Sequence, residues 1–379
     1  MLGGHERDPV PRDLVVRATG KPDEAAAYVS LVVDRGEVER PHLFPDRGGS
    51  GVMTTFVARK GRVDRHRADG NDGRQYTAET MPETARWFEL AGLQVHSVSW
   101  SPQDRPDGAP ARQVLLIHGL GAHTLSWAPV GQRLADALDA EVEAFDLIGF
   151  GHTRALRYAA RFDSNVSLVG RLLEQIGPAL LIGNSMGGTI AVAVAAREPS
   201  LVDGLVLLDP ALPNPVRHRA HLPVVTRFVP LLAGPIGRAV LTARARMLGP
   251  ERLVDDTLAI VLQDASAFDP ALREQFVTLT AQRYSYPEAA RAYCDAAQTM
   301  FWYMTRRMDR DFVALRDASV PTLLLHGEHD RLVSVAAARA TARRHPHVEF
   351  KVLDGVGHAP QLEAPERVVD EVAKFVVRT

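Results

Sequence analysis

The stretch "LIGNSMGGTI" (residues 181–190) leads from an apolar run, through glycines, into an alanine-rich segment. Ser185 sits in its middle, with Gly183 two residues before it and Gly187 two residues after it. A sharp strand-to-helix turn strains the backbone of its central residue and lifts that side chain out of the sheet. Glycines are needed on either side because side chains there would collide across the turn. The pattern G-x-S-x-G also recurs by chance as a structural turn, but a strand before it and a helix after it favour Ser185 as a nucleophile.

Similar apolar runs recur on both sides of this turn, and each ends in Gly, Asp or His. Runs of this length are typical of strands buried on both faces, and the segments between them have helical periodicity. The alternation predicts an α/β fold with a mostly parallel central sheet flanked by helices. Ahead of it, "RWFEL" and "LQVHSVSW" flank Ala91-Gly92 and predict a hairpin of two strands. The runs span residues 113–119, 141–149, 179–185, 204–210, 322–330 and 349–358.

Two regions depart from this alternation. About 100 residues between Asp209 and Val320 have the pattern of several helices, which is too long for a single crossover and predicts an inserted helical cap. The N-terminal region is dense in Arg, Asp, Gly and Pro and predicts a largely disordered extension, with one short element at residues 25–34. The predicted parts are the extension (1–83), the first core segment (84–211), the cap (212–312) and the second core segment (313–379).

A serine hydroxyl needs a base to take its proton, and a histidine base needs a carboxylate to orient it. His358 follows the last strand in "DGVGH", on a glycine-rich loop at the carboxyl ends of the strands. Asp330 ends the strand in "LLLHGEHD" at the same edge and is the first candidate for the acid. Asp209, which ends the strand in "LLDP", is the alternative acid, and Glu328 is a third candidate.

The loop after the strand "LLIHG" is expected to hold the developing oxyanion. The backbone N–H groups of Leu120, which follows Gly119, and of Met186, which begins the helix after Ser185, are the candidate donors. The neighbouring side chains of His118, His123 and Trp127 are expected to be structural.

The order Ser185, Asp330, His358 resembles the α/β-hydrolase superfamily, together with "HGLG", "DLIGFGHT", "GNSMGG", "LLLHGEHD" and "GVGH" at the matching strand ends. The resemblance covers roughly residues 86–379. It implies an α/β-hydrolase fold, with these three residues as nucleophile, acid and base, and with oxyanion donors at Leu120 and Met186. Haloalkane dehalogenases and epoxide hydrolases carry an aspartate at the nucleophile position, so Ser185 argues against both. The dipeptide Ser-Met in "GNSMGG" is similar to carbon–carbon bond hydrolases of aromatic degradation, to esterases and to cofactor-free haloperoxidases.

These residues predict a serine hydrolase that cleaves a carboxylic ester, or a related carbonyl substrate with an apolar portion, through an acyl-enzyme. Such chemistry needs no cofactor and no metal. Carbon–carbon hydrolysis of a diketone, acyl transfer and haloperoxidase chemistry are alternatives on the same triad. A non-catalytic ligand receptor on this fold is the alternative from another class.

Composition indicates which classes of partner and which cellular compartment to expect. The net charge of −2 gives no reason to expect nucleic acid, and no run approaches the roughly 18 apolar residues of a membrane span. Without an apolar secretory signal, the expectation is a cytoplasmic protein with a small-molecule substrate. Cys294 is the sole cysteine and is expected to be a packed thiol. The histidines of "RHRAHLP" (217–223) lack a carboxylate set, and the aromatic run "FWYM" (301–304) is expected to pack the cap onto the core.

Overall fold

The structure, a computed structural model, describes residues 14–19, 28–33, 85–103, 112–156, 159–213 and 234–379. The chain divides into two units, residues 1–68 and 69–379. In the first unit, β1 (Leu14–Thr19) pairs antiparallel with β2 (Tyr28–Val33). The predicted short element at 25–34 contains β2, whereas β1 was not predicted. The remainder of the predicted extension lies outside the described residues.

The second unit is built on an eight-stranded sheet with the order β10-β9-β8-β7-β5-β6-β4-β3. Strands β5 to β10 pair in parallel, as predicted, because each is joined to the next by a helical crossover. The predicted hairpin is β3–β4, which is antiparallel and turns through positive φ at Ala91 and Gly92. The strands are β3 (Ala85–Leu90), β4 (Leu93–Trp100), β5 (Arg112–Ile117), β6 (Ala140–Phe145), β7 (Ala179–Asn184), β8 (Val202–Leu208), β9 (Thr322–Gly327) and β10 (Glu349–Leu353).

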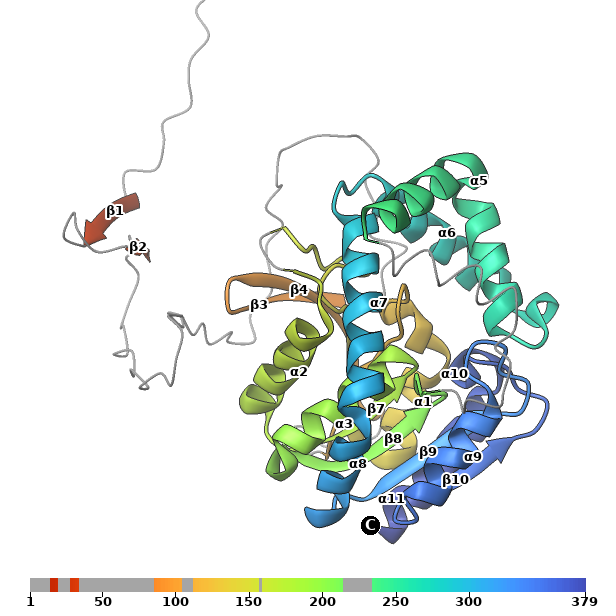
Figure 1. Cartoon of the computed structure of the whole chain (residues 1–379). Helices are drawn as coiled ribbons and strands as arrows, with labels where there is room; N and C mark the ends of the chain where they lie inside the picture. Colours follow the sequence, from red (N-terminus) through yellow and green to blue (C-terminus); the bar gives the residue numbers. More distant parts are fainter. Residues whose placement is uncertain (1–13, 20–27, 34–84, 104–111, 157–158, 214–233) are drawn as a thin grey trace, which may run out of the picture. The chain divides into compact units, whose positions relative to one another are not determined.

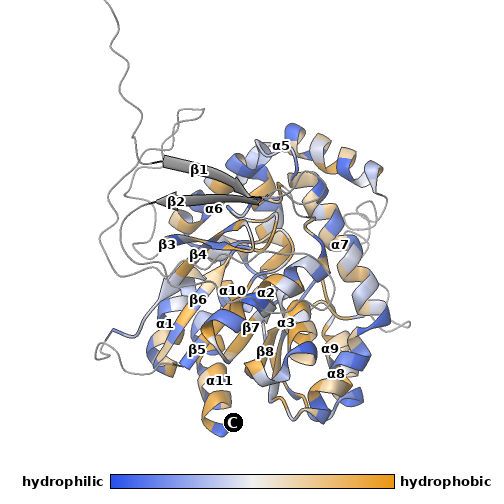
Figure 2. Ribbon diagram, turned by 90° about the vertical axis from the view of Figure 1, so that its left-hand side faces the viewer, coloured by the Kyte–Doolittle hydropathy of each residue, from blue (hydrophilic) through white to orange (hydrophobic). Residues whose placement is uncertain are grey.

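Helices cover both faces of this sheet, and the alternation of side chains along β5 shows how. Val114 and Leu116 pack into one apolar cluster with α1 and α11, whereas Leu115 and Ile117 pack into another with α2 and α3. The apolar colouring of the strands and inner helix faces follows these two layers (Figure 2). The flanking helices are α1 (Ala128–Leu138), α2 (Phe162–Ile176), α3 (Met186–Arg197), α9 (Val335–Arg344) and α11 (Pro365–Arg378).

Between β8 and β9 the chain forms the predicted group of helices. Figure 1 shows α5 and α6 gathered at one end of the second unit, with α7 running from them down to the flank of the sheet. α5 is interrupted at Gly249, whose φ of 73° turns the chain before Pro250. The helices of this segment are α5 (Pro235–Val261), α6 (Pro270–Tyr284), α7 (Ala289–Arg306) and α8 (Met308–Asp317).

The C-terminal helix of this segment, α8, packs against the helices that flank the sheet. α8 crosses the predicted boundary at residue 312, and its residues Met308, Phe312 and Leu315 pack into the same apolar cluster as α3. Of the aromatic run 301–304, Tyr303 packs as predicted: its ring stacks on Phe162 and its hydroxyl donates to Asp311 at 2.5 Å. Phe301 and Trp302 point to solvent, so the run packs through one of its aromatic rings. No helix in the described residues is long and apolar enough to cross a membrane.

Candidate active site

Ser185 lies at the junction of β7 and α3 with a strained backbone, φ 52° and ψ −117°. A Cβ on Gly183 would lie 2.5 Å from the carbonyl carbon of Gly187, so the predicted collision across the turn is confirmed there. A Cβ on Gly187 would lie 1.9 Å from the carbonyl oxygen of Ile117, at the end of β5. The second glycine is therefore required by the neighbouring strand rather than by the first glycine. The half-buried Ser185 precedes Met186, the first residue of α3, where the free N–H groups of a helix gather.

The structure brings the predicted acid and base together. The Nδ1 of His358 lies 2.7 Å from Oδ2 of Asp330, and both side chains are buried. Oδ1 of Asp330 accepts the backbone N–H groups of Leu332 at 2.7 Å and Val333 at 3.0 Å. Burial opposes the charged form of Asp330, but His358 and these donors outweigh it and lower the pKa of this carboxyl. An ionised Asp330 only accepts, so the shared proton sits on His358 Nδ1.

Asn184 ties the loop of His358 to the nucleophile turn. Its side-chain amide donates to the carbonyl oxygens of His358 at 3.0 Å and of Leu208 at 3.1 Å. Since Asn184 immediately precedes Ser185, this one buried side chain fixes the loop of His358 relative to the turn of Ser185.

The alternative acid, Asp209, lies in the same buried group. Ligand atoms of Asp209, Asp330 and His358 all lie within 4.8 Å of one another. Oδ1 of Asp209 accepts the N–H of Gly327 at 2.8 Å, while its Oδ2 is buried without a hydrogen-bond donor in the described part of the chain. Burial and the charge of Asp330 raise the pKa of Asp209 well above its usual range. The surroundings thus favour the protonated form of Asp209 beside the charged form of Asp330.

His326, on β9, lies between these two carboxyl groups and was not predicted from the sequence. Its Nε2 donates to the carbonyl oxygen of Val333 at 2.9 Å, and it lies 3.4 Å from Asp330 and 3.5 Å from Asp209. Burial lowers the pKa of His326, which keeps this imidazole neutral. The third acid candidate, Glu328, is exposed and accepts the N–H of Gly355, so it lies apart from this group.

The loop after β5 approaches Ser185, as predicted. A Cβ on Gly119 would lie 3.1 Å from the Cβ of Ser185. His118 braces this loop: its Nδ1 donates to the carbonyl oxygen of Gly119 at 2.8 Å, and its Nε2 accepts the N–H of Leu147 at 2.9 Å. Burial lowers the pKa of His118 and so favours this neutral form. Because the carbonyl of Gly119 and the N–H of Leu120 share one peptide plane, His118 fixes the direction of that N–H.

Residues of α7 contact the same loop. A Cβ on Gly121 would lie 2.7 Å from the ring of Tyr293 on α7, and Leu120 packs against Cys294 and Ala297 of the same helix. Cys294 is buried in this cluster, as predicted, and burial raises the pKa of its thiol.

A second cap contact is made at the "DLIGFGHT" loop. Arg283 of α6 donates to the carbonyl oxygens of Gly149 at 2.7 Å and Gly151 at 3.2 Å. In the same loop the buried Asp146 accepts from His96 at 2.8 Å and from the N–H of Thr124 at 2.8 Å. Although burial opposes its charge, His96 lowers the pKa of Asp146. The loop is therefore a braced strand end that also binds α6 through Arg283.

Two other predicted structural residues are buried as expected. His123 meets the ring of Phe276 edge-on, with centroids 4.5 Å apart, and burial lowers its pKa to about 3. Trp127 is enclosed in the apolar cluster under α1 and α11. The histidine-rich stretch at 217–223 lies outside the described residues.

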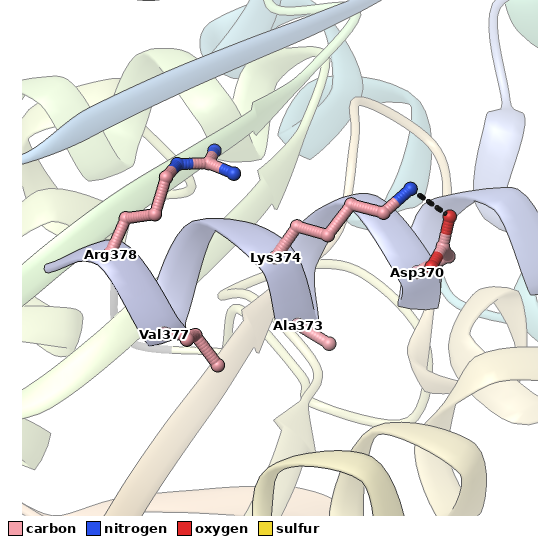
Figure 3. A pocket seen from close by; sticks show the side chains of 5 residues that line it. All are labelled: Asp370, Ala373, Lys374, Val377 and Arg378. Atoms are coloured by element: carbon pink, nitrogen blue, oxygen red, sulfur yellow. Dashed lines mark hydrogen bonds and ion pairs between the residues drawn. The ribbon is translucent and has the colours of Figure 1, made fainter.

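A shallow surface hollow runs along α11, with Lys374 paired to Asp370 at 2.5 Å (Figure 3). It is open to solvent and includes none of the buried polar residues around Ser185, so we assign it no part in the site. Its lining residues are Asp370, Ala373, Lys374, Val377 and Arg378.

Comparison with known proteins identifies the family. The model of the alpha/beta hydrolase family matches residues 114–371. The 2-hydroxymuconate semialdehyde hydrolase of Pseudomonas putida is 27% identical over 304 residues, which cover 79% of this chain and 96% of that protein. The pimeloyl-[acyl-carrier protein] methyl ester esterase of Nitrosospira multiformis is 27% identical over 273 residues, covering 69% and 93%.

Solved structures share the fold at lower identity. A thermophilic esterase from Thermogutta terrifontis superposes with a TM-score of 0.55 and 23% identity, over 76% of this chain and 94% of that one. A meta-cleavage product hydrolase from Pseudomonas fluorescens superposes with a TM-score of 0.56 and 20% identity, over 77% and 97%.

Proposed function

The chain belongs to the alpha/beta hydrolase family, and on that premise we propose that it is a serine hydrolase of carboxylic esters or related carbonyl compounds. The observation that carries the proposal is the buried pair of His358 and ionised Asp330, tied through Asn184 to the strained turn of Ser185. A nucleophile, a base and an orienting carboxylate at one sheet edge are the parts that acyl transfer needs.

In the first half-reaction, His358 takes the proton of Ser185 Oγ through its Nε2 while Oγ bonds to the carbonyl carbon. Asp330 accepts from Nδ1 and stabilises the imidazolium that forms. The N–H groups of Leu120 and Met186 hold the carbonyl oxygen as it gains negative charge. The tetrahedral intermediate then expels the alcohol, which receives the proton from His358 and leaves an acyl-enzyme.

In the second half-reaction the same groups act on water. His358 takes a proton from the water as its oxygen attacks the acyl carbon, and then returns that proton to Ser185 Oγ as the ester bond breaks. The products are the carboxylic acid and the free enzyme. The pKa of Asp209 is raised and that of Asp330 is lowered, which favours a single negative charge, on Asp330, beside the imidazole.

The surroundings of the site support a substrate with an apolar portion. Leu120 packs against Cys294 and Ala297 of α7, as do Tyr293 and Leu241, so apolar side chains flank the loop that carries the proposed oxyanion donor. The cap, predicted at residues 212–312, would supply the substrate-facing wall.

The resemblance of this chain to both an esterase and a semialdehyde hydrolase favours one alternative, hydrolysis of a carbon–carbon bond in a diketone by the same residues. A series of p-nitrophenyl esters of increasing acyl length, run beside a diketone substrate, separates the two. Ester turnover that rises with chain length and exceeds diketone turnover supports the main proposal, and the reverse order supports the alternative.

A fluorophosphonate probe tests the nucleophile directly. Wild type is expected to be labelled and Ser185→Ala is expected not to be. Absence of labelling in the folded wild type, or equal labelling of the variant, would overturn the nucleophile assignment and favour a non-catalytic receptor.

A further inference from the structure

The carboxylate of Glu363, at the end of α10 (Pro360–Glu363), joins the cap to the loop of the proposed base. Its Oε2 accepts the N–H of Gly357, next to His358, at 2.6 Å. Its Oε1 accepts the N–H groups of Gln263 at 2.7 Å and Asp264 at 3.0 Å, just after α5 ends. One carboxylate therefore satisfies three backbone donors from two separate segments, a demand that no neutral side chain of this size meets.

The end of α5 also bonds to the base's own backbone. The carbonyl oxygen of Val261 accepts the N–H of His358 at 2.7 Å and that of Ala359 at 3.2 Å. A Cβ on Gly357 would lie 2.7 Å from this oxygen, so only glycine allows the two segments to approach so closely. The last turn of a cap helix is thus in direct contact with the peptide that carries the base.

The loop of the acid holds the same helix end from another side. The guanidinium of Arg331, adjacent to Asp330, donates to the carbonyl oxygens of Ala259 at 2.7 Å and Leu262 at 3.2 Å. These two bonds come from Nη1, and Nη2 donates to the side-chain oxygen of Gln263 at 3.0 Å. A cation at the C-terminus of a helix is favourably placed, because the free carbonyl groups point toward it.

We propose that Glu363 is a positioning residue for His358, which it holds in line with Ser185 only while the end of α5 is seated against the base's loop. The inference rests on the proposed function of Ser185 and His358. It adds that the position of the cap and the competence of the base are coupled through this carboxylate. Such coupling matters because displacement of a catalytic group by about 1 Å can cost on the order of 100-fold in rate.

The test compares Glu363→Gln with Glu366→Gln, a matched control whose exposed carboxylate pairs with Arg133 on the surface. Glutamine keeps the length of the side chain but replaces one acceptor by a donor that faces a backbone N–H. We expect kcat on a p-nitrophenyl ester to fall about 10-fold or more in E363Q, with KM within about 3-fold, and both values nearly unchanged in the control. A kcat within 2-fold of wild type in folded E363Q would overturn the proposal.

Two further measurements separate positioning from simple stability. The proton on His358 Nδ1, hydrogen-bonded to Asp330, should give a far-downfield ¹H NMR signal that shifts or broadens in E363Q. An unmoved signal would show that the base keeps its geometry and would overturn the proposal. Arg331→Met, which releases the end of α5 without touching the carboxylate, should lower kcat in the same direction. If it does not, the coupling to the cap is wrong.

Ser185→Ala is run in parallel. If that variant keeps full turnover, the proposed function itself fails. If it is inactive while E363Q retains wild-type kcat, only the positioning role fails.

Discussion

Asp209 and Asp330 bring their carboxyl groups to within 4.8 Å of one another in the core, and within the described residues Asp330 is the one that bonds to His358. Their environments push the two pKa values apart, Asp209 upward and Asp330 downward. The difference follows from the donors: Asp330 accepts from an imidazole and two backbone N–H groups, whereas Asp209 accepts from one backbone N–H. A carboxylate is stable in the interior only where enough donors replace water.

This asymmetry predicts unequal effects of the two isosteric amide variants. Asp330→Asn should lower kcat about 10³-fold or more, because the amide cannot hold His358 in the correct tautomer. Asp209→Asn should change kcat by less than about 5-fold, because asparagine matches the neutral acid in shape and charge. Steady-state ester hydrolysis by both variants measures this. A large loss confined to Asp209→Asn would make Asp209 the acid.

The raised pKa of Asp209 also predicts how stability depends on pH. The folded protein binds this proton more tightly than the unfolded chain, in which aspartate has a pKa of about 3.9. The stabilising contribution is therefore complete below that value and is lost as pH rises through the folded pKa. Asparagine does not titrate, so the stability of Asp209→Asn relative to wild type should rise with pH. Urea unfolding of both proteins from about pH 4 to pH 8 checks it, and parallel curves would contradict a neutral Asp209.

Gly187 and Gly170 offer a matched pair of glycine-to-alanine changes. At Gly187 the added methyl group would meet the carbonyl oxygen of Ile117 at 1.9 Å, so Gly187→Ala should destabilise the fold by about 3 kcal/mol or more. At Gly170, within α2, nothing lies within 4 Å of an added Cβ, and Gly170→Ala should stabilise by about 0.5–1 kcal/mol. Thermal unfolding of both variants distinguishes steric crowding at the turn from a general intolerance of alanine.

His118 should affect kcat although its observed contacts only hold the loop after β5 in place. His118→Ala removes the bonds that orient the peptide between Gly119 and Leu120, so one proposed oxyanion donor loses its direction. We expect kcat to fall about 100-fold with little change in KM. His347→Ala, a half-buried histidine before β10, serves as the control and should keep wild-type kcat. Equal effects of the two changes would mean that His118 contributes only to stability.

Much of the fold could be predicted because its signals are local. The apolar runs and the helical periods between them each follow from adjacent residues, and so does the turn at Ser185. The edge positions of His358 and Asp330 follow from the alternation of strands and helices, because parallel strands end at one edge. Neither inference needs the order of strands in the sheet.

The contacts that could not be predicted depend on which strands are neighbours in the sheet. Asp209 and Asp330 meet because β8 and β9 lie side by side, and no spacing along the chain reveals that pairing. His326 and Glu363 were not predicted, since the contact of His326 with Asp209 and those of Glu363 with Gln263 and Asp264 join distant segments. The outward direction of Phe301 and Trp302 likewise depends on which face of α7 meets the core.

The break in α5 at Gly249 has a consequence for redesign. With Pro250 at the first position of a new helical stretch, the chain from there to Val261 begins independently of what precedes it. That second stretch carries the hydrogen bonds to the loops of His358 and Asp330. The peptide between Gly249 and Pro250 is thus a natural junction for chimeras. The first stretch of α5 can be exchanged there for that of another hydrolase, while the second stretch keeps its hydrogen bonds to the loops of His358 and Asp330.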